Sequence, residues 1–138
     1  MEKYNLNEDV KVYCTTAKSF PAGIQEAFIT LEKMLSKEGR TFYGISHGSK
    51  DGGIIYKAAV SENFEGEAEK YGFETFIIKK GEYINETIID WREKIDTIGP
   101  TFQRLLAHPL FDRISPCIEW YKSDKELVCM VKTDLSKV

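Results

Sequence analysis

The sequence contains few residues of the kinds that build metal centres. It has three cysteines and two histidines in 138 residues, and it has no C-x-x-C pair. Structural zinc sites usually take four closely spaced Cys or His ligands. No metal ligand is therefore assigned, and no cofactor is expected.

Long hydrophobic runs are also missing. No apolar run approaches the roughly 20 residues that a membrane-spanning helix needs. The start "MEKYNLNEDV" lacks the apolar core of a secretory signal. We therefore expect a cytoplasmic protein without a membrane partner.

The chain has no excess of positive charge. Its 19 Lys and Arg are interspersed with 22 Asp and Glu, which gives a net charge of -3. Binding to duplex DNA requires clustered Lys and Arg, so we expect no direct DNA binding. A hydrophobic fraction of 42% is ordinary for a globular chain, and the length fits one domain over residues 1–138.

An odd number of cysteines without a secretory signal favours free thiols. In "CIEWYKSDKELVCMV", a hairpin that turns at 124–125 places Cys117 opposite Lys132 and Cys129 opposite Trp120. The two sulfurs then lie on opposite sides of the sheet, which prevents a disulfide between them.

We predict that Cys14, Cys117 and Cys129 are all free thiols, because neither the expected compartment nor the expected hairpin supports a disulfide. A maleimide reagent applied under denaturing, non-reducing conditions should add three labels per chain. Fewer than three labels would show that the register or the compartment is wrong.

The first half of the sequence predicts a strand, a helix and two strands. "DVKVYCTTAKSF" alternates in polarity and predicts a strand over 10–18. "PAGIQEAFITLEKMLSKEG" predicts a helix over 21–37, with proline at its entry, glycine after its end and one apolar stripe. "TFYGISHGSKDGGIIYKAAV" predicts two strands joined by a glycine-rich turn.

The second half repeats this order. "GFETFIIKKGEY" predicts a strand over 72–79, and "INETIIDWREKIDTI" predicts a helix over 86–97. A shorter helix that ends at Pro109 and a final hairpin follow. At an offset of 60 residues, Leu31 aligns with Trp91.

These patterns predict an α+β fold made of duplicated strand–helix–strand–strand units. The repeat halves are 9–60 and 72–133. One antiparallel sheet would carry two main helices on one face, with a cleft between the halves.

The stretch "PCIEWYKSD" contains a carboxylate in an unusual place. Large β-favouring residues predict a buried strand, and alternation puts Glu119 on the same face as Cys117 and Tyr121. Ile118 and Trp120 point to the other face. Neither face looks solvated, so the carboxylate needs an explanation.

Other motifs give no site. "GSKDGG" leads into a β-like segment rather than a helix, so it indicates a hairpin turn and not a phosphate loop. Ser46 and His47 are adjacent on a strand, so their side chains diverge and do not form a nucleophile–base pair. His108 precedes a proline and is interpreted as a capping or surface residue.

Nearly the whole chain, over about 9–133, resembles the GyrI-like small-molecule-binding domains of the SOUL/GyrI-like superfamily. "FETFIIKKGEYINETIIDW" is similar to their strand, "hxGxY" turn and following helix, with Lys79 where many members have histidine. "FYGISHGSKDGGIIYKAAV" is similar to their first hairpin, and "CIEWY" to their late "xxEvY" strand.

The resemblance implies an effector-binding domain like that of multidrug-sensing transcription activators, where a buried glutamate receives lipophilic cations. Glu119 matches that glutamate, Tyr121 the tyrosine two residues later, and Tyr83 the turn tyrosine. Trp91 and Tyr56 complete the candidate ligand-binding residues. A desolvated carboxylate is costly unless it is paired, and a bound cation would supply the missing charge.

Alternatives remain open. Glu119 would instead be structural if it pairs with a lysine or arginine. Similar GyrI-like proteins hydrolyse strained cyclopropane-bearing compounds, and the carboxyl of Glu119 suits general acid–base work. Binding is favoured over catalysis, so no catalytic residue is assigned. A gyrase-inhibitor-like interaction protein is a further alternative. Haem binding of the SOUL type is a third possibility, but the sequence lacks a well-placed axial histidine for it.

Two departures from the family affect the expected role. Glu82 stands where proline is common in the turn. The transcription activators also carry a DNA-binding domain, for which these 138 residues leave no room. The resemblance therefore implies a separate sensor or sequestering protein in transcription regulation or toxin resistance, with any protein partner unspecified.

Overall fold

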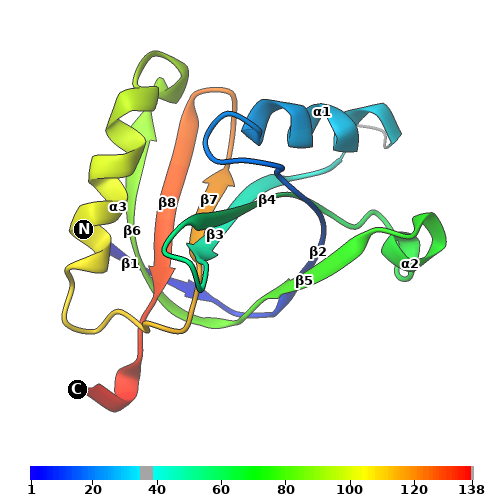
Figure 1. Ribbon diagram of the computed structural model, residues 1–138. Helices are drawn as coiled ribbons and strands as arrows, with labels where there is room; N and C mark the ends of the chain where they lie inside the picture. The colour runs from blue at the N-terminus through cyan, green and yellow to red at the C-terminus, as the bar shows by residue number, and fades with distance from the viewer. Residues whose placement is uncertain (35–38, 138) are drawn as a thin grey trace.

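The computed structural model describes residues 1–34 and 39–137 (Figure 1). None of the helices in these ranges is long and apolar enough to cross a membrane. The strands are β1 (Glu2–Leu6), β2 (Val10–Thr16), β3 (Phe42–Gly48), β4 (Ile54–Ser61), β5 (Glu74–Ile78), β6 (Gly81–Ile89), β7 (Cys117–Tyr121) and β8 (Glu126–Lys132). The helices are α1 (Ile24–Met34), α2 (Glu67–Tyr71) and α3 (Ile98–Leu106), with short 3-10 helices η1 (Trp91–Glu93), η2 (Ile95–Thr97) and η3 (Leu135–Lys137).

Within the described residues, all strands join one antiparallel sheet in the order β1-β6-β8-β7-β3-β4-β2-β5. Strands β3 and β7 are neighbours at its centre, where the first and second halves of the chain meet (Figure 1). The predicted α+β class and antiparallel sheet are confirmed.

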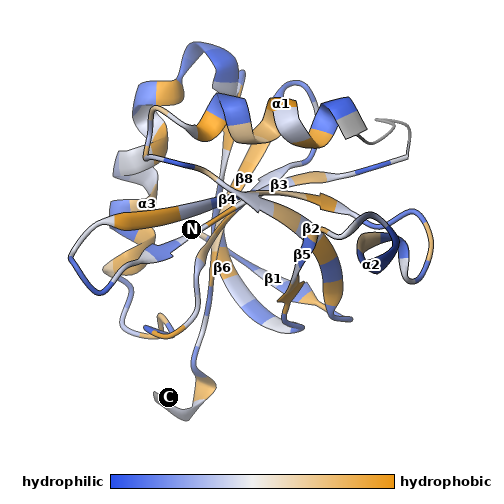
Figure 2. Cartoon of the chain, turned by 45° about the vertical axis from the view of Figure 1, so that its right-hand side comes forward, coloured by the Kyte–Doolittle hydropathy of each residue, from blue (hydrophilic) through white to orange (hydrophobic). Residues whose placement is uncertain are grey.

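One face of the sheet carries both longer helices, and we call it the helix face. Helix α1 packs on a cluster that includes Val60, and α3 packs on a cluster that includes Leu127. Val60 pairs with Phe42, Phe42 with Tyr121, and Tyr121 with Leu127, so these residues share one face. Figure 2 shows hydrophobic and hydrophilic residues alternating along α1, as expected for a helix with one side on the sheet.

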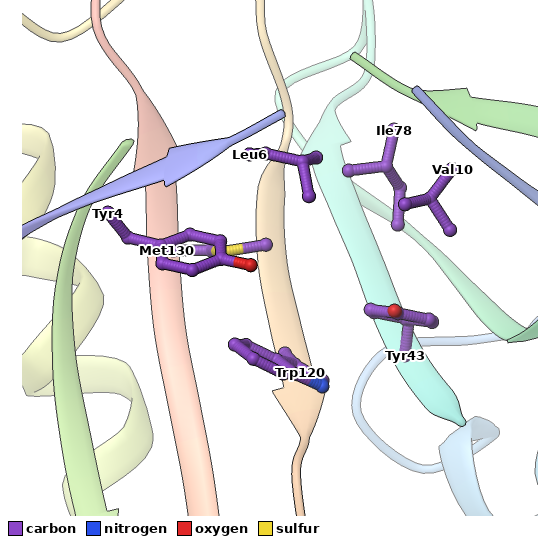
Figure 3. Close-up of a pocket in the computed structure, with 7 residues that line it drawn as sticks. All are labelled: Tyr4, Leu6, Val10, Tyr43, Ile78, Trp120 and Met130. Carbon is purple, nitrogen blue, oxygen red and sulfur yellow. The ribbon is translucent and has the colours of Figure 1, made fainter. Parts of the chain in front are cut away.

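The opposite face, which we call the inner face, carries a cluster that includes Ile45, Ile118 and Met130. Leu6 of β1 and Ile78 of β5 line one small hollow on this face, although their strands are the two edges of the sheet (Figure 3). The sheet is therefore curled around its inner face until the edges approach each other.

The elements expected in the first half are confirmed with small shifts. The strand over 10–18 is β2, and the glycine-rich hairpin is β3 and β4. The helix over 21–37 is α1, which begins at Ile24; positions 35–37 lie outside the described residues. The strand over 72–79 is β5.

The predicted helix over 86–97 is wrong, because Gly81–Ile89 is strand β6 and α3 begins only at Ile98. Ile84 and Ile88 are four residues apart, a spacing that puts them on one side of a helix and also on one face of a strand. Four of the nine residues in β6 are β-branched, which favours the strand.

The predicted offset of 60 residues is also wrong. Leu31 lies in α1, whereas Trp91 begins the 3-10 helix η1. The strands that this offset treats as equivalent, β2 and β5, are antiparallel neighbours instead.

The register of the last hairpin differs from the prediction by one residue. Glu119 pairs with Cys129 because Ser123 shapes a three-residue loop, in which its hydroxyl accepts the Glu126 N–H at 3.0 Å. Cys117 and Cys129 therefore lie on the same face and not on opposite faces. The cysteines are nevertheless all free, as predicted.

A buried ion pair fixes the connector that contains α2. The Arg40 and Glu67 side chains are each 4% exposed and share two hydrogen bonds, of 2.6 and 3.0 Å. The Tyr13 hydroxyl donates to Glu67 and accepts from Arg40. Hydrogen bonds from Arg40, reinforced by those from Tyr13 and the Asn63 N–H, hold the pKa of Glu67 at about 2.

We predict that Arg40→Met lowers the free energy of unfolding by about 3–5 kcal/mol, because it leaves the Glu67 carboxylate buried without a cationic partner. The matched control is Arg104→Met, which breaks an exposed pair with Glu86 and should cost less than about 1 kcal/mol. Urea unfolding at neutral pH measures both. Equal losses would contradict the structural role of the buried pair.

The same pair predicts a dependence of stability on pH. Because the folded pKa of Glu67 lies below the ordinary 4.5, its contribution is complete above about pH 4.5 and is lost as pH falls toward 2. The decline in unfolding free energy over this interval should be shallower in Glu67→Gln.

Candidate functional site

The candidate site is built where β3 and β7 pair at the centre of the sheet. Gly44 of β3 lies opposite Glu119 of β7. Tyr56 reaches the same place from β4, where it pairs with Ser46. Alternation along β7 directs Glu119 to the helix face, together with Cys117 and Tyr121.

Two tyrosine hydroxyls hold the Glu119 carboxylate. Tyr56 and Tyr121 both donate to its Oε1, at 2.5 and 2.9 Å. Tyr56 is only 2% exposed, so its ring is fixed by its surroundings. Within the described residues, no hydrogen bond to Oε2 is found and no Lys or Arg forms an ion pair with this carboxylate.

The electrostatics of the site favour either the protonated, neutral form of Glu119 or a positively charged partner for its carboxylate. Burial raises the pKa of Glu119, although the hydrogen bonds from Tyr56 and Tyr121 partly oppose the rise. Burial, followed by the nearby carboxylate, raises the pKa of both tyrosines, which therefore remain hydroxyl donors. Burial also raises the pKa of the adjacent Cys117 thiol to about 11, so it is not a reactive thiolate.

Aromatic rings from both sides surround the carboxylate. Phe28 of α1 makes edge contacts with Tyr56 and Tyr121, at centroid distances of 6.3 and 5.8 Å. Trp91 of η1 contacts Tyr121 at 5.1 Å, and Phe20 contacts Tyr56 at 6.0 Å. The wall of the site therefore contains residues from both halves of the chain.

Gly44 makes this arrangement possible. A β-carbon at this position would overlap the Tyr56 hydroxyl and Oε1 of Glu119. Glycine inside a strand often marks such a close approach. The hydrogen bond from Tyr56 of β4 to Glu119 of β7 thus crosses β3 at Gly44, where no side chain stands in its way.

Four of the five predicted site residues come together: Glu119, Tyr121, Tyr56 and Trp91. Tyr83 does not join them. It is 3% exposed on the inner face, where its hydroxyl donates to the Lys79 carbonyl at 2.6 Å. The physical reason is alternation in β6, which directs Ile84 and Ile88 to the helix face and Tyr83 to the other.

The sequence patterns did not identify three site residues: Phe28, Phe20 and Gly44. Phe28 belongs to the apolar stripe of the predicted helix, which gives no sign that its ring faces a carboxylate. Gly44 did carry a signal, because it interrupts the β-favouring run "TFYGIS".

The Trp91 indole N–H is buried and has no hydrogen-bond partner among the described residues. An unpaired buried donor costs about 1–3 kcal/mol. The indole ring of Trp91 contacts Tyr121, so this unpaired donor belongs to a residue of the candidate site. In the same ranges, no three His, Cys, Asp or Glu residues gather closely enough to hold a metal ion.

Comparison with known proteins finds similarity of structure alone. No family model matches the chain. No curated protein matches it either.

Solved structures share the fold over almost the whole chain. An integron cassette protein from Vibrio cholerae has a TM-score of 0.68 and 13% identity, covering 96% of this chain and 95% of that one. SAV2435, solved bound to tetraphenylphosphonium, has a TM-score of 0.57 and 11% identity, covering 95% and 93%. A hydrolase from Listeria innocua has a TM-score of 0.52 and 12% identity, covering 96% and 91%.

We predict that Gly44→Ala separates Tyr56 from Glu119 and lowers the free energy of unfolding by about 1–3 kcal/mol through overpacking. Gly48→Ala is the matched control on the same strand, because a β-carbon there meets no atom of the described residues within 4 Å. Urea unfolding compares the two variants. Equal stabilities would show that the close approach at Gly44 does not exist.

Proposed function

We propose that this chain is a GyrI-like domain that binds small lipophilic cations at Glu119. The main support is the state of this carboxylate. It is held by two tyrosines among aromatic rings, without a cationic side chain among the described residues as its partner. The alternative in which Glu119 serves a structural ion pair lacks a partner in that part of the chain.

The ligand class follows from charge and surroundings. A desolvated carboxylate gains most from a positive charge that loses little hydration on entry, which favours an aromatic or otherwise lipophilic cation. The rings of Phe28, Tyr121 and Trp91 add attraction of roughly 0.5–2 kcal/mol each where they face the cation. One protein with this fold, SAV2435, is bound to such an ion, tetraphenylphosphonium.

The proposed role is that of a sensor or sequestering protein in transcription regulation or toxin resistance, working through its ligand. Its balanced charge is consistent with a protein that does not bind DNA itself. Any regulatory effect would then pass through another molecule.

We propose in addition that the single domain is a duplication. The order strand, helix, strand, strand occurs in β2-α1-β3-β4 and again in β6-α3-β7-β8. The sheet places β6-β8-β7 on one side of its centre and β2-β4-β3 on the other, in the same order from each edge. The second unit on this basis is 81–132.

A hydrolase remains the second candidate, because burial raises the pKa of Glu119 and thereby suits it to proton transfer. One protein with this fold is a hydrolase. Mass spectrometry of a strained cyclopropane compound incubated with the protein would detect addition of water. Turnover that is lost in Glu119→Gln would favour this candidate over binding alone.

The binding proposal predicts a selective loss in Glu119→Gln. Affinity for tetraphenylphosphonium should fall by about 1–3 kcal/mol, the scale of a hydrogen bond or contact with a charged group. Stability should hold or rise, because the free site no longer buries a carboxylate. Isothermal titration and thermal unfolding measure the two effects.

Tetraphenylborate, which has the same shape and the opposite charge, is the control ligand. It should bind the native protein much more weakly than tetraphenylphosphonium. In Glu119→Gln, the difference in affinity between the two ions should be smaller. Unchanged affinity for the cation, together with lost stability, would overturn the proposal and indicate a structural role for Glu119.

A further inference from the structure

The inner face carries a second, larger hollow that is distinct from the Glu119 site. Its volume is about 780 Å³, within the range of about 300–1,000 Å³ that is typical of ligand pockets. Its apolar lining includes Phe76, Ile78, Tyr83 and Ile118. Ile118 precedes Glu119 on β7, but the two side chains point to opposite faces, so the two sites share no lining residue.

Three lysines meet at this hollow. Lys79 and Lys80 form the turn between β5 and β6, and both line the hollow together with Lys132 of β8. A β-carbon on Gly81 would lie 3.2 Å from the Lys132 ammonium nitrogen, so this ammonium group lies beside the turn. Among the described residues, none of the three lysines forms an ion pair.

The two acidic residues at the hollow are used locally. Asp9 accepts the backbone N–H of Lys80 at 2.8 Å. Asp112 accepts the Ile114 N–H at 3.2 Å and the Ser115 hydroxyl at 2.9 Å. Three lysines against two aspartates leave a formal charge of +1 at the hollow, and the ammonium groups are its free hydrogen-bond donors.

A smaller hollow adjoins the larger one at Ile78. Tyr4, Leu6, Tyr43, Trp120 and Met130 help to line it (Figure 3). Its volume is about 30 Å³, the space of about one water molecule. An apolar group is therefore accommodated in the larger hollow, against Ile78 and Ile118.

We propose that the larger hollow binds a free anionic amphiphile, with its acidic head at Lys79, Lys80 and Lys132 and its apolar tail against Phe76, Ile78 and Ile118. Apolar walls with a few convergent charged donors are the usual form of such a pocket. The ligand charge is opposite to that proposed for the Glu119 site, so the two sites select different molecules.

The test is titration of the full chain with decanoate, decan-1-ol and decyltrimethylammonium, the two ions below their micelle concentrations and the alcohol below its solubility limit. Decanoate should bind more tightly than the alcohol and the cation, and backbone NMR signals of residues 76–83 and 114–118 should shift. Decanoate affinity no greater than that of decan-1-ol would overturn the proposal.

Charge reversal locates the head group. The double variant Lys79→Glu/Lys80→Glu changes two exposed residues and should weaken decanoate binding at least tenfold. The control is the single variant Lys50→Glu in the exposed β3–β4 turn, which should leave the affinity for decanoate unchanged. Equal affinities in the two variants would overturn the proposal.

Two further measurements distinguish this hollow from the Glu119 site and from a membrane-binding surface. The decanoate affinity of Glu119→Gln should equal that of the native protein, so failure of one site does not depend on failure of the other. Vesicles of phosphatidylglycerol test a membrane source for the acidic head. If the protein sediments with these vesicles but does not bind decanoate, the proposal of a free amphiphile is overturned and the hollow is assigned to a membrane surface instead.

Discussion

The pairing of Gly44 with Glu119 is the contact on which the rest of the candidate site depends. It lies on the β3–β7 seam, where the two halves of the sheet are joined. Because Gly44 has no side chain, Tyr56 reaches across β3 to the carboxylate on β7. Tyr121 and the aromatic rings of α1 and η1 then complete an enclosure around a charge that the sheet alone would not stabilise.

Sequence patterns predicted the fold well where one periodicity dominated. The strand β2, the helix α1 and the β3–β4 hairpin each had a clear period and clear ends. The prediction for strand β6 failed because Ile84 and Ile88, which are four residues apart, fit one side of a helix and one face of a strand equally. Strand β1 was missed because its five residues form a short, mostly exposed edge whose order depends on pairing with β6.

The site was predictable in part for similar reasons. Alternation correctly grouped Glu119 with Tyr121, because this needs only the residues of one strand. The family resemblance also selected Tyr83, but its place on the inner face depends on the register of β6. Phe28 and Gly44 act through tertiary contacts that span 93 and 75 positions of the chain, so local patterns did not identify them.

The seam has a consequence for the use of the protein as a tool. Tyr56 and Gly44 come from the chain before α2, whereas Glu119, Tyr121 and Trp91 come from the chain after it. The halves are interlocked, since β1 is bound by β6 and β5 by β2. If the polypeptide were divided at Gly72, each fragment would hold half of the candidate site. A ligand that binds only the joined site then favours reassociation by RT ln(1 + [L]/Kd), which makes the divided protein a complementation reporter for that ligand.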